Sequence, residues 1–305
     1  RRDSGVPVAL DWYWWHHNPY DSGYPNYWPP REGEDAFGRA VRRMNDAGVH
    51  TQVYMNGLTW DRDDPSWEPD GAACALVGED GEPKSQAFNV YDRHRLAWMC
   101  TEAQPFRDRI ARQVEKLEKA GLPGVYLDMI SCGLNPGPCF NPKHRHAPGG
   151  VDGYVEGYRE WLLSLKAKHP KMEFSSEEVS EGYLDVFDSF ISLFASWERV
   201  GWLPAYPEGE VVPVFNALYH GLATVFGSYA SIDGIPPWDP EWPDADRWTE
   251  ERDWKALFPD QFAIELARTV VWGMQPTVHN FRLSAADDPR LADDYRFMVD
   301  TAKFY

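Results

Sequence analysis

The feature that most constrains this fold is a repeated alternation of short apolar runs and amphipathic helical stripes. Apolar runs predict strands at residues 6–13, 50–57, 124–130, 171–177, 190–194, 211–216, 223–228 and 276–281. Helical stripes predict helices at 34–47, 104–120, 152–168, 259–273 and from 289 onward. With no second core apparent, this pattern predicts one (β/α)8 TIM barrel over residues 1–305, with long aromatic-rich loops at its C-terminal rim. An open doubly wound sheet is less favoured, because no glycine-rich phosphate fingerprint follows the first strand.

Charge and hydropathy argue against two classes of partner. The formal net charge is -18 at pH 7 and the pI is about 4.9, which argues against binding to nucleic acid or to an anionic membrane surface. No apolar run is long enough to cross a bilayer, so membrane insertion is not expected. The chain opens without an initiator methionine, and we expect a domain cut from a longer, processed protein.

A buried strand that ends in an acid is the first sign of chemistry. Residues 124–130 are apolar apart from Asp128 near their C-terminal end, where parallel α/β folds bind ligands. A buried carboxylate is costly unless it is paired, hydrated or functional, although Asp128 could also cap the following loop. Glu177 ends the next predicted strand, and neighbouring strands lie about 4.8 Å apart. Two acids placed in this way can bracket a glycosidic bond, as glycoside hydrolysis requires.

Aromatic residues are abundant, with 15 each of Trp, Tyr and Phe at a mean hydropathy of -0.56. Sugar rings stack on such side chains, so we predict a cleft lined by loops 14–30, 58–99, 131–150 and 233–248, the second of which can hold a small hairpin. Core packing is the alternative. The candidate substrate-binding residues, each of which could instead make a structural contact, are Asp11, Trp14, His16, His17, Asn56, Trp60, Asp61, His144, His146, Asn216, His220, His279 and Asn280.

The four cysteines are too few for a disulfide scaffold; they are Cys74, Cys100, Cys132 and Cys139. Cys132 and Cys139 flank a loop that a disulfide could close, or both could be buried thiols. Together with His144 and His146 they could hold zinc, but the spacing is not a common one. A loop disulfide with His146 near the substrate is therefore preferred, and no metal or cofactor is expected.

Several short motifs, spread over most of the chain, together resemble a known family. They are Trp12-Tyr13 with the aromatic loop to residue 30, Tyr54-Met55-Asn56-Gly57 followed by Trp60-Asp61, Met99-Cys100, Gly124-Val125-Tyr126-Leu127-Asp128, Cys139 with His144-Arg145-His146 and Gly149-Gly150, and Ser176-Glu177 followed by Glu181-Gly182-Tyr183. They resemble a bacterial glycoside-hydrolase-like family of unknown function, often secreted or on the cell surface. Its barrel is similar to that of endo-α-N-acetylgalactosaminidases.

The resemblance implies roles for the two acids. In those α-acting enzymes an Asp after one strand is the nucleophile and a Glu after the next strand is the acid/base, which implies these roles for Asp128 and Glu177. The chain departs from the pattern in having Glu178 beside Glu177 and Arg145 between the two histidines. Side chains alternate along a strand, so only one of the two glutamates should face the cleft, and Glu177 is preferred. A secreted or cell-surface location is expected, with the cytoplasm left open.

Three functions are compatible with these patterns. The first is a retaining glycoside hydrolase that acts on an α-linked oligosaccharide or polysaccharide, with Asp128 and Glu177 as its catalytic acids. The second is a non-catalytic carbohydrate-binding barrel, and the third is a metal-assisted hydrolase that uses the Cys/His loop. The acids at the strand ends favour the first function over the second, and metal analysis separates the third from both. A Ser/His/Asp hydrolase is disfavoured because no G-x-S-x-G motif is present.

Overall fold

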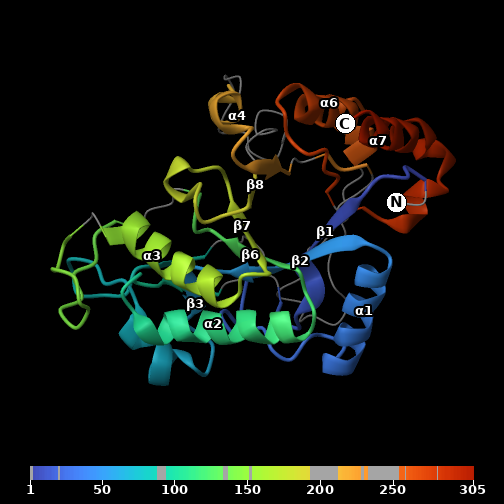
Figure 1. Cartoon of the computed structure of the whole chain (residues 1–305). Helices are drawn as coiled ribbons and strands as arrows, with labels where there is room; N and C mark the ends of the chain where they lie inside the picture. Colours follow the sequence, from blue (N-terminus) through green and yellow to red (C-terminus); the bar gives the residue numbers. More distant parts are fainter. Residues whose placement is uncertain are drawn as a thin grey trace.

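A six-stranded parallel sheet forms the centre of the molecule (Figure 1). The computed structural model describes residues 3–19, 21–87, 94–132, 137–150, 153–192, 212–227, 230–232, 254–257, 259–279 and 281–305. In order across the sheet, the strands are β1 (Val8–Trp12), β2 (Val49–Asn56), β6 (Gly124–Asp128), β7 (Glu173–Glu177), β8 (Ser189–Ile191) and β9 (Thr224–Phe226). Every neighbouring pair is parallel.

This sheet confirms the α/β class and forms a curled half-barrel. Strand order follows chain order, as it does in a (β/α)8 barrel. Beyond β9, single parallel bridges join Phe226 to Gln275 and Ser231 to His279. Within the described part of the chain, β1 pairs only with β2, and Leu10 of β1 is 39% exposed. Closure to eight strands therefore stays a prediction.

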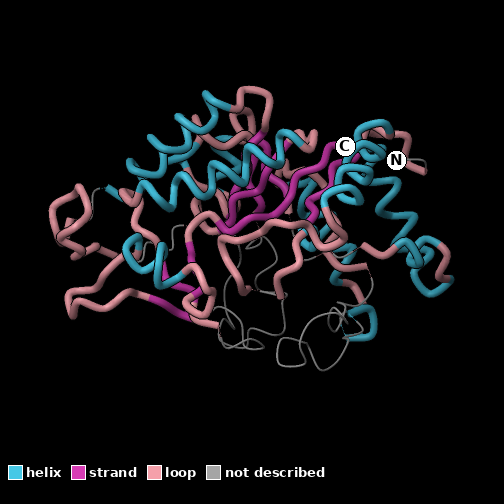
Figure 2. The backbone as a smooth tube through the Cα atoms, turned by 90° about the horizontal axis from the view of Figure 1, so that it is seen from below, coloured by secondary structure: helices cyan, strands magenta, loops and turns pink. Residues whose placement is uncertain are grey.

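Residue alternation gives the sheet two different faces. In β2 and β6, the side chains of Val53, Met55, Val125 and Leu127 are fully buried in the main hydrophobic core. Three helices line this outer face, as Figures 1 and 2 show: α1 (Glu34–Asp46), α2 (Gln104–Lys119) and α3 (Gly153–Lys168). The residues between these apolar positions point to the concave side, where a barrel keeps its interior.

Helix α2 shows how the sequence builds this outer layer. Its buried stripe is Phe106, Ile110, Val114 and Leu117, at the spacing of one helical face. Gly121 then takes a left-handed conformation, with φ of 89°, and its N–H donates to the Glu118 carbonyl at 2.9 Å. A glycine in this position ends a helix without steric cost, and the chain turns directly into β6.

A small antiparallel sheet fills the excursion between β2 and α2. Strand β3 (Thr59–Asp61) pairs with β5 (Leu96–Trp98), which pairs with β4 (Ser85–Gln86). The hairpin expected in this region is therefore confirmed, with one further strand. Short helical turns complete the connections: η1 (Tyr13–Trp15), η2 (Trp67–Gly71), η3 (Ala72–Cys74), η4 (Glu181–Tyr183), η7 (Leu283–Ala286) and η8 (Pro289–Leu291).

The C-terminal part is helical and has its own apolar cluster. Its helices are α4 (Val214–Tyr219), α5 (Trp254–Leu257), α6 (Gln261–Val271) and α7 (Ala292–Phe304). Ile232, Phe262, Leu266 and Leu291 form the centre of this cluster. Helices α6 and α7 lie side by side near the chain's N-terminal end (Figure 1), and the Tyr295 hydroxyl donates to Asp3 Oδ2 at 2.5 Å.

Two strand predictions in this part are wrong. Residues 214–216 of the predicted strand 211–216 lie in helix α4, because Pro213 stands immediately before the first turn and the Ala217 N–H donates to its carbonyl at 2.9 Å. Among the described residues of the predicted strand 276–281, a single bridge forms, at His279, and Pro276 has no N–H to give to a ladder. The predicted loop 233–248, residues 193–194 of the predicted strand 190–194, and Asn280 lie outside the described residues.

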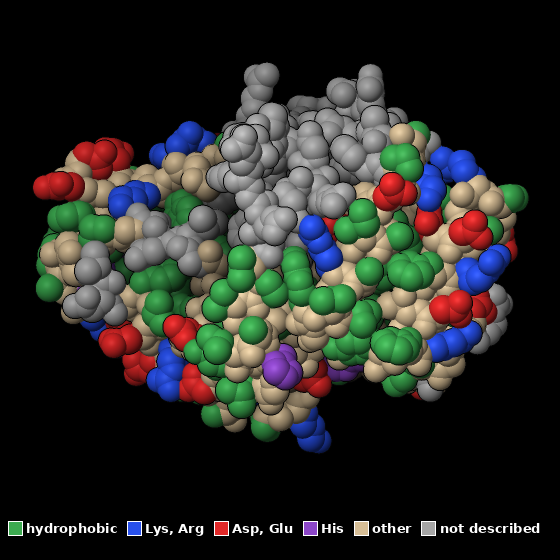
Figure 3. All heavy atoms as spheres, turned by 90° about the horizontal axis from the view of Figure 1, so that it is seen from above, with side chains coloured by type: hydrophobic (Ala, Val, Ile, Leu, Met, Phe, Trp, Pro, Cys, Tyr) green, Lys and Arg blue, Asp and Glu red, His purple; other side chains and the backbone are tan. Residues whose placement is uncertain are grey.

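The surface carries charges of both signs. On the face drawn in Figure 3, acidic and basic side chains are interspersed among apolar ones. Among the described residues, none of the helices combines the length and the apolar character that a bilayer crossing requires.

Replacing one fully buried residue of α2 tests this packing. We expect Leu117→Ala to lower the free energy of unfolding by about 2–5 kcal/mol, because it leaves a cavity between α2 and the sheet. Arg112→Ala, on the exposed face of the same helix, should change it by less than about 0.5 kcal/mol. Urea denaturation of both variants measures the difference, and equal losses would contradict the placement of α2.

Candidate active site

The concave face of the sheet is polar near the C-terminal ends of its strands. Strand register aligns Tyr54 with Tyr126, and Asn56 with Asp128. On the next strand Ser175 is level with Tyr126, so Glu177, two residues further on, is on the same face as Asp128. The pleat therefore brings the predicted acid pair to one side and one end of the sheet.

Asp128 is held by two phenol groups. The Tyr54 hydroxyl donates to Asp128 Oδ2 at 3.0 Å, and the Tyr126 hydroxyl donates to Oδ1 at 2.7 Å. The two tyrosine rings pack with their centroids 5.7 Å apart. Each carboxylate oxygen thus has a donor from a buried ring, and the direction of the carboxyl group is fixed.

The environment of Asp128 stabilises its neutral form more than water does. Burial raises the pKa of Asp128 to about 6, although the hydrogen bonds from Tyr126, Tyr54 and the Met129 backbone oppose the rise. Desolvation destabilises the carboxylate, whereas donors to its oxygens stabilise it. Asp128 is therefore largely ionised at neutral pH and titrates in weakly acidic solution.

Glu177 has a still stronger tendency to keep its proton. Burial raises the pKa of Glu177 well above its ordinary value, and the negative charges of Asp128 and Glu178 raise it further. A hydrogen bond with Cys132 opposes the shift, and the charge of Asp21 adds to it. Since Asp21 belongs to the loop after β1, that loop reaches the end of the sheet where Glu177 stands.

Glu178 lies in a different environment from Glu177. Its backbone φ is 57°, its side chain is buried, and the Ser192 hydroxyl donates to its Oε2 at 3.5 Å. Met129, directly after Asp128, has a φ of 69°. Both strands thus leave the sheet through a non-glycine residue in the left-handed region, a strained conformation that often marks functional sites.

Two serines fasten the ends of β6 and β7 to each other. The Ser176 hydroxyl donates to the Leu127 carbonyl at 2.6 Å. The Ser131 N–H donates to Ser176 Oγ at 3.2 Å, and the Ser131 hydroxyl lies 2.6 Å from the Glu177 carbonyl oxygen. These bonds set the relative position of the two strand ends, and hence of the two acids.

Asp11 adds a third carboxyl group to the concave face. It is the register partner of Gln52 on β2. Asp11 is exposed on the open side of the half-barrel, and desolvation by the protein atoms around its carboxyl group, together with the charge of Asp128, raises its pKa to about 7. A hydrogen bond from Gln52 opposes the rise, and Gln52 in turn accepts a bond from the Ser175 hydroxyl at 2.7 Å.

The aromatic loop after β1 is mostly core. Trp15, Tyr24 and Tyr27 are at most 1% exposed. His16 lies fully buried among these rings, neither of its ring nitrogens has a hydrogen-bond partner, and burial lowers the pKa of His16 to about 3. Trp14, in contrast, is 37% exposed. The predicted aromatic lining is thus a packed support for the most part.

Four other predicted ligands have structural partners. Asn56 Oδ1 accepts bonds from the N–H groups of Leu58 and Thr59 at 3.0 and 2.8 Å. The buried Trp60 donates to Ser66 Oγ at 3.1 Å. Asp61 accepts from the Gly23 N–H at 2.7 Å and lies 2.9 Å from His94 Nδ1. His17 is exposed, with Nδ1 2.9 Å from the Pro29 carbonyl.

Two of the C-terminal candidates belong to α4 and its C-terminal end, and a third follows α6. Asn216 lies in α4, and its carbonyl oxygen is 2.9 Å from His220 Nδ1. His279 is bridged to Ser231, and burial lowers the pKa of His279 to about 4.

The expected disulfide between Cys132 and Cys139 is absent. All four cysteines are free thiols. Cys132 donates to the Met129 carbonyl at 3.1 Å, whereas Cys139 lies in a cluster with Cys100, His144 and His146. The two loop histidines are therefore grouped with sulfur ligands.

Sequence reasoning missed the residues that orient the acids. Tyr54, Tyr126, Ser131 and Ser176 carry the hydrogen bonds that fix the two strand ends. Tyr126 could have been found from alternation, because it shares a face with Asp128 two residues later. Ser131 could not have been found in this way, since its partners Ser176 and Glu177 lie on β7.

Comparison with known proteins agrees with this architecture. The family described as a domain of unknown function (DUF6259) matches residues 1–230. The chain belongs to this family. The resemblance of its motifs to a glycoside-hydrolase-like family of unknown function is thereby confirmed.

Longer relatives of this DUF6259 domain carry glycoside hydrolase names. "Putative glycoside hydrolase" from Bacteroides thetaiotaomicron is 28% identical over 239 residues, which cover 77% of this chain and 33% of that protein. "Putative glycoside hydrolase 22789" from Monosiga brevicollis is 27% identical over 262 residues, which cover 76% of this chain and 20% of that protein. The DUF6259 chain thus spans a third or less of these relatives.

Solved glycosidases share the fold of this DUF6259 domain. A quadruple mutant of the α-N-acetylgalactosaminidase NagBb from Bifidobacterium bifidum aligns with a TM-score of 0.69 at 18% identity, covering 99% of this chain and 42% of that one. The α-galactosidase TtGalA from Thermus thermophilus aligns with a TM-score of 0.59 at 13% identity, covering 90% of this chain and 52% of that one. At these identities the likeness shows the fold alone.

The raised pKa of Asp128 predicts how stability depends on pH. The folded-state pKa of about 6 exceeds the ordinary value of 3.8, so the folded protein binds the proton more tightly and loses stability as the pH rises through 6. Asp128→Asn removes this loss of stability, because an amide does not titrate. Relative to wild type, the variant should gain about 2 kcal/mol of unfolding free energy between pH 4 and pH 8.

Asp185→Asn is the matched control for this experiment. A hydrogen bond from Arg159 lowers the pKa of Asp185, so this substitution should give the opposite slope, with a penalty that appears above the ordinary pKa and disappears in acid. Urea titrations at a series of pH values measure both differences. A flat difference for Asp128→Asn would show that Asp128 is not desolvated.

Proposed function

We propose that this DUF6259 domain is the catalytic barrel of a retaining glycoside hydrolase that acts on α-linked glycans. One observation carries the proposal: Asp128 and Glu177 end adjacent parallel strands on the concave face, with different protonation tendencies. Glycoside hydrolysis needs one ionised carboxylate and one carboxylic acid on either side of the scissile bond. The glycoside hydrolase names of the relatives and the fold shared with glycosidases support the assignment.

The surroundings of the two acids favour a division of roles. Near pH 7 Asp128 is mostly ionised, and two phenols aim its oxygens. The pKa of Glu177 is raised well above its ordinary value, because burial and the charge of Asp128 both disfavour its carboxylate, so Glu177 is the member of the pair with the stronger tendency to carry the proton. A pair of carboxyl groups whose pKa values are held apart is the usual arrangement of nucleophile and general acid.

The reaction then proceeds in two displacements. In the first, a carboxylate oxygen of Asp128 attacks the anomeric carbon while Glu177 gives its proton to the leaving oxygen, so the glycosidic bond breaks and a glycosyl ester forms. In the second, the Glu177 carboxylate takes a proton from water, whose oxygen attacks the same carbon and frees Asp128. Two inversions give net retention. This chemistry requires the two carboxyl groups to lie about 5–5.5 Å apart.

Barrel closure, the choice of substrate and a role for Asp11 belong to the same proposal. Closure of the half-barrel to eight strands would bring the loops after each strand around the acids. The names of the structural neighbours point to α-galactosides and N-acetyl-α-galactosaminides as the first substrates to try. Asp11, also on the concave face, is a candidate contact for a sugar hydroxyl because its carboxyl group can donate or accept near neutral pH.

Hydrolysis of nitrophenyl glycosides tests the activity directly. We expect the purified protein to release nitrophenol from α-linked substrates and not from their β-linked counterparts. Proton NMR should detect the α-anomer as the first sugar product, because two inversions preserve the configuration. First formation of the β-anomer would indicate an inverting enzyme. Glycan binding without release of nitrophenol would instead indicate a non-catalytic carbohydrate-binding barrel.

Substitution of the two acids tests their roles. Asp128→Asn should abolish turnover, because the amide is nearly isosteric but a poor nucleophile. Glu177→Ala should slow glycosides with poor leaving groups by about 10²–10⁴-fold and affect activated aryl glycosides far less. Added azide should partly restore Glu177→Ala by attacking the glycosyl ester without needing a base.

Two further variants serve as comparisons for this pair. Asp185→Asn, at the surface, should keep wild-type rates. Glu178→Gln should show none of the leaving-group dependence of Glu177→Ala. A loss of activity that depends on the leaving group in Glu178→Gln would instead assign the acid/base role to Glu178. Retention of most activity by Asp128→Asn would overturn the assignment of the nucleophile.

A further inference from the structure

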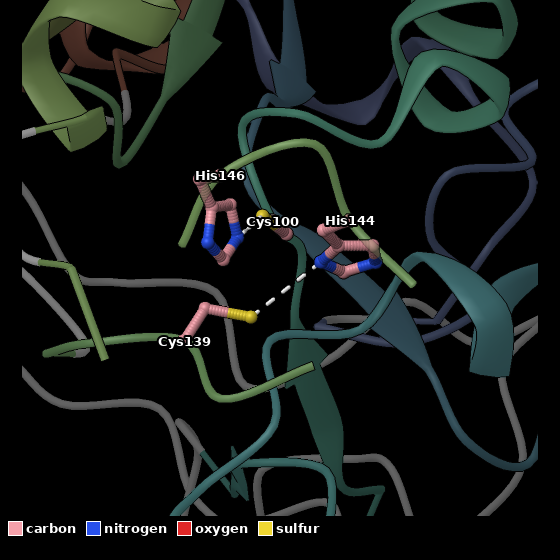
Figure 4. Close-up of side chains that lie close together, drawn as sticks. All are labelled: Cys100, Cys139, His144 and His146. Atoms are coloured by element: carbon pink, nitrogen blue, oxygen red, sulfur yellow. Dashed lines mark hydrogen bonds between the residues drawn. The ribbon is translucent and has the colours of Figure 1, made fainter. Parts of the chain in front are cut away.

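Two cysteines and two histidines from distant parts of the chain converge on one point (Figure 4). Cys100 follows strand β5, whereas Cys139, His144 and His146 belong to the loop between β6 and α3. One possible ligand atom from each residue lies within 4.8 Å of the others. Both cysteines are buried and free.

The spacing of these atoms fits a tetrahedral centre. Cys100 Sγ is 3.2 Å from His146 Nε2, and Cys139 Sγ is 3.5 Å from His144 Nδ1. Zinc–sulfur bonds of about 2.3 Å and zinc–nitrogen bonds of about 2.0–2.1 Å at tetrahedral angles place sulfur and nitrogen about 3.5 Å apart. Both observed sulfur–nitrogen distances are within about 0.3 Å of this value.

The far nitrogen of each imidazole has a backbone partner. His144 Nε2 is 3.0 Å from the Ala73 carbonyl oxygen, and His146 Nδ1 is 3.0 Å from the Ala147 carbonyl oxygen. A carbonyl only accepts, so His146 Nδ1 carries the proton, and His146 Nε2 faces Cys100 with a free lone pair. His144 Nε2 has a second neighbour, the donor Asn141 Nδ2 at 3.2 Å, and Zn²⁺ at Nδ1 requires the tautomer in which Nε2 donates to Ala73. This is the arrangement that orients histidine ligands in metal sites.

We propose that Cys100, Cys139, His144 and His146 form a structural zinc site. Two thiolates and two imidazoles are a ligand set that zinc prefers in tetrahedral geometry. Each thiol gives up its proton on binding, and the two resulting negative charges balance the ion. Four protein ligands leave no open position for water or substrate, so the metal stabilises the fold and takes no part in hydrolysis.

The site would connect three segments of the chain. Residues 137–150, between β6 and α3, contain no helix or strand. The ion would tie it to Cys100, whose N–H bonds to the Cys74 carbonyl at 2.9 Å. Through the Ala73 carbonyl, His144 links the same centre to η3. Zinc at this centre would therefore hold residues 137–150 against η3 and the end of β5.

Metal analysis of the whole purified protein is the primary test. Protein produced with zinc in the medium and purified under reducing conditions should contain about one equivalent of zinc by elemental mass spectrometry. Replacement by Co²⁺ should give the intense visible d–d absorption of a tetrahedral site and a thiolate-to-cobalt charge-transfer band. Removal of the metal with a chelator should lower the Tm by about 5 °C or more.

Matched variants assign the ligands. Cys139→Ser and His144→Ala should reduce bound zinc to less than about 0.1 equivalent. Cys132→Ser and His17→Ala, which change the same residue types outside the cluster, should keep it. If the ligand variants do not fold, the cobalt spectrum of the wild-type protein still decides, because it reports directly on sulfur coordination.

Three results would overturn the proposal. Zinc content below about 0.1 equivalent with no uptake of added Zn²⁺ would mean that the four side chains form only a hydrogen-bonded cluster. A Cys100–Cys139 disulfide in the freshly purified protein, detected by peptide mass mapping, would exclude the thiolate ligands. An octahedral cobalt spectrum would exclude this ligand set.

Discussion

The accommodation of negative charge on the concave face is the constraint on which the rest of the structure depends. Desolvation raises the pKa of both Asp11 and Glu177, and the charge of Asp128 raises each of them further. Phenol donors from Tyr54 and Tyr126 offset part of this cost at one carboxylate. The rest must be balanced by apolar burial on the other face of the same strands, beneath the three helices.

The parts of the site that follow from local rules could be predicted from the sequence. Asp128 and Glu177 each end a strand, and both the strand type and the alternation of side chains depend only on nearby residues. The stripe of α2 and the glycine that ends it are equally local. Residues 214–216 show the limit of this reasoning, because a short apolar run beside Pro213 is compatible with either a strand or a helix until the rest of the fold is known.

Features that depend on distant contacts could not be predicted. The abundance of aromatic residues does not distinguish a cleft lining from a core, and most rings of the first loop, including Trp15 and Tyr27, are core. The partner of Cys139 is Cys100, which reaches it only through the small antiparallel sheet. From spacing alone, Cys132 groups with Cys139 and the two loop histidines, and a Cys132–Cys139 disulfide is preferred to a metal. The structure places Cys100 in this cluster instead and leaves all four thiols free.

Met129 and Glu178 have a consequence for the engineering of this domain. Each stands in a left-handed backbone conformation directly after a candidate catalytic acid, at φ of 69° and 57°. Glycine at position 178 would relieve strain on the order of 1 kcal/mol, whereas glycine at position 129 would also remove a core side chain that is 4% exposed. Screens for heat resistance would therefore select the substitution at position 178. Because those backbones set where the acids point, the thermostable variants would be poor catalysts, and selection on melting temperature alone would remove the function from this fold.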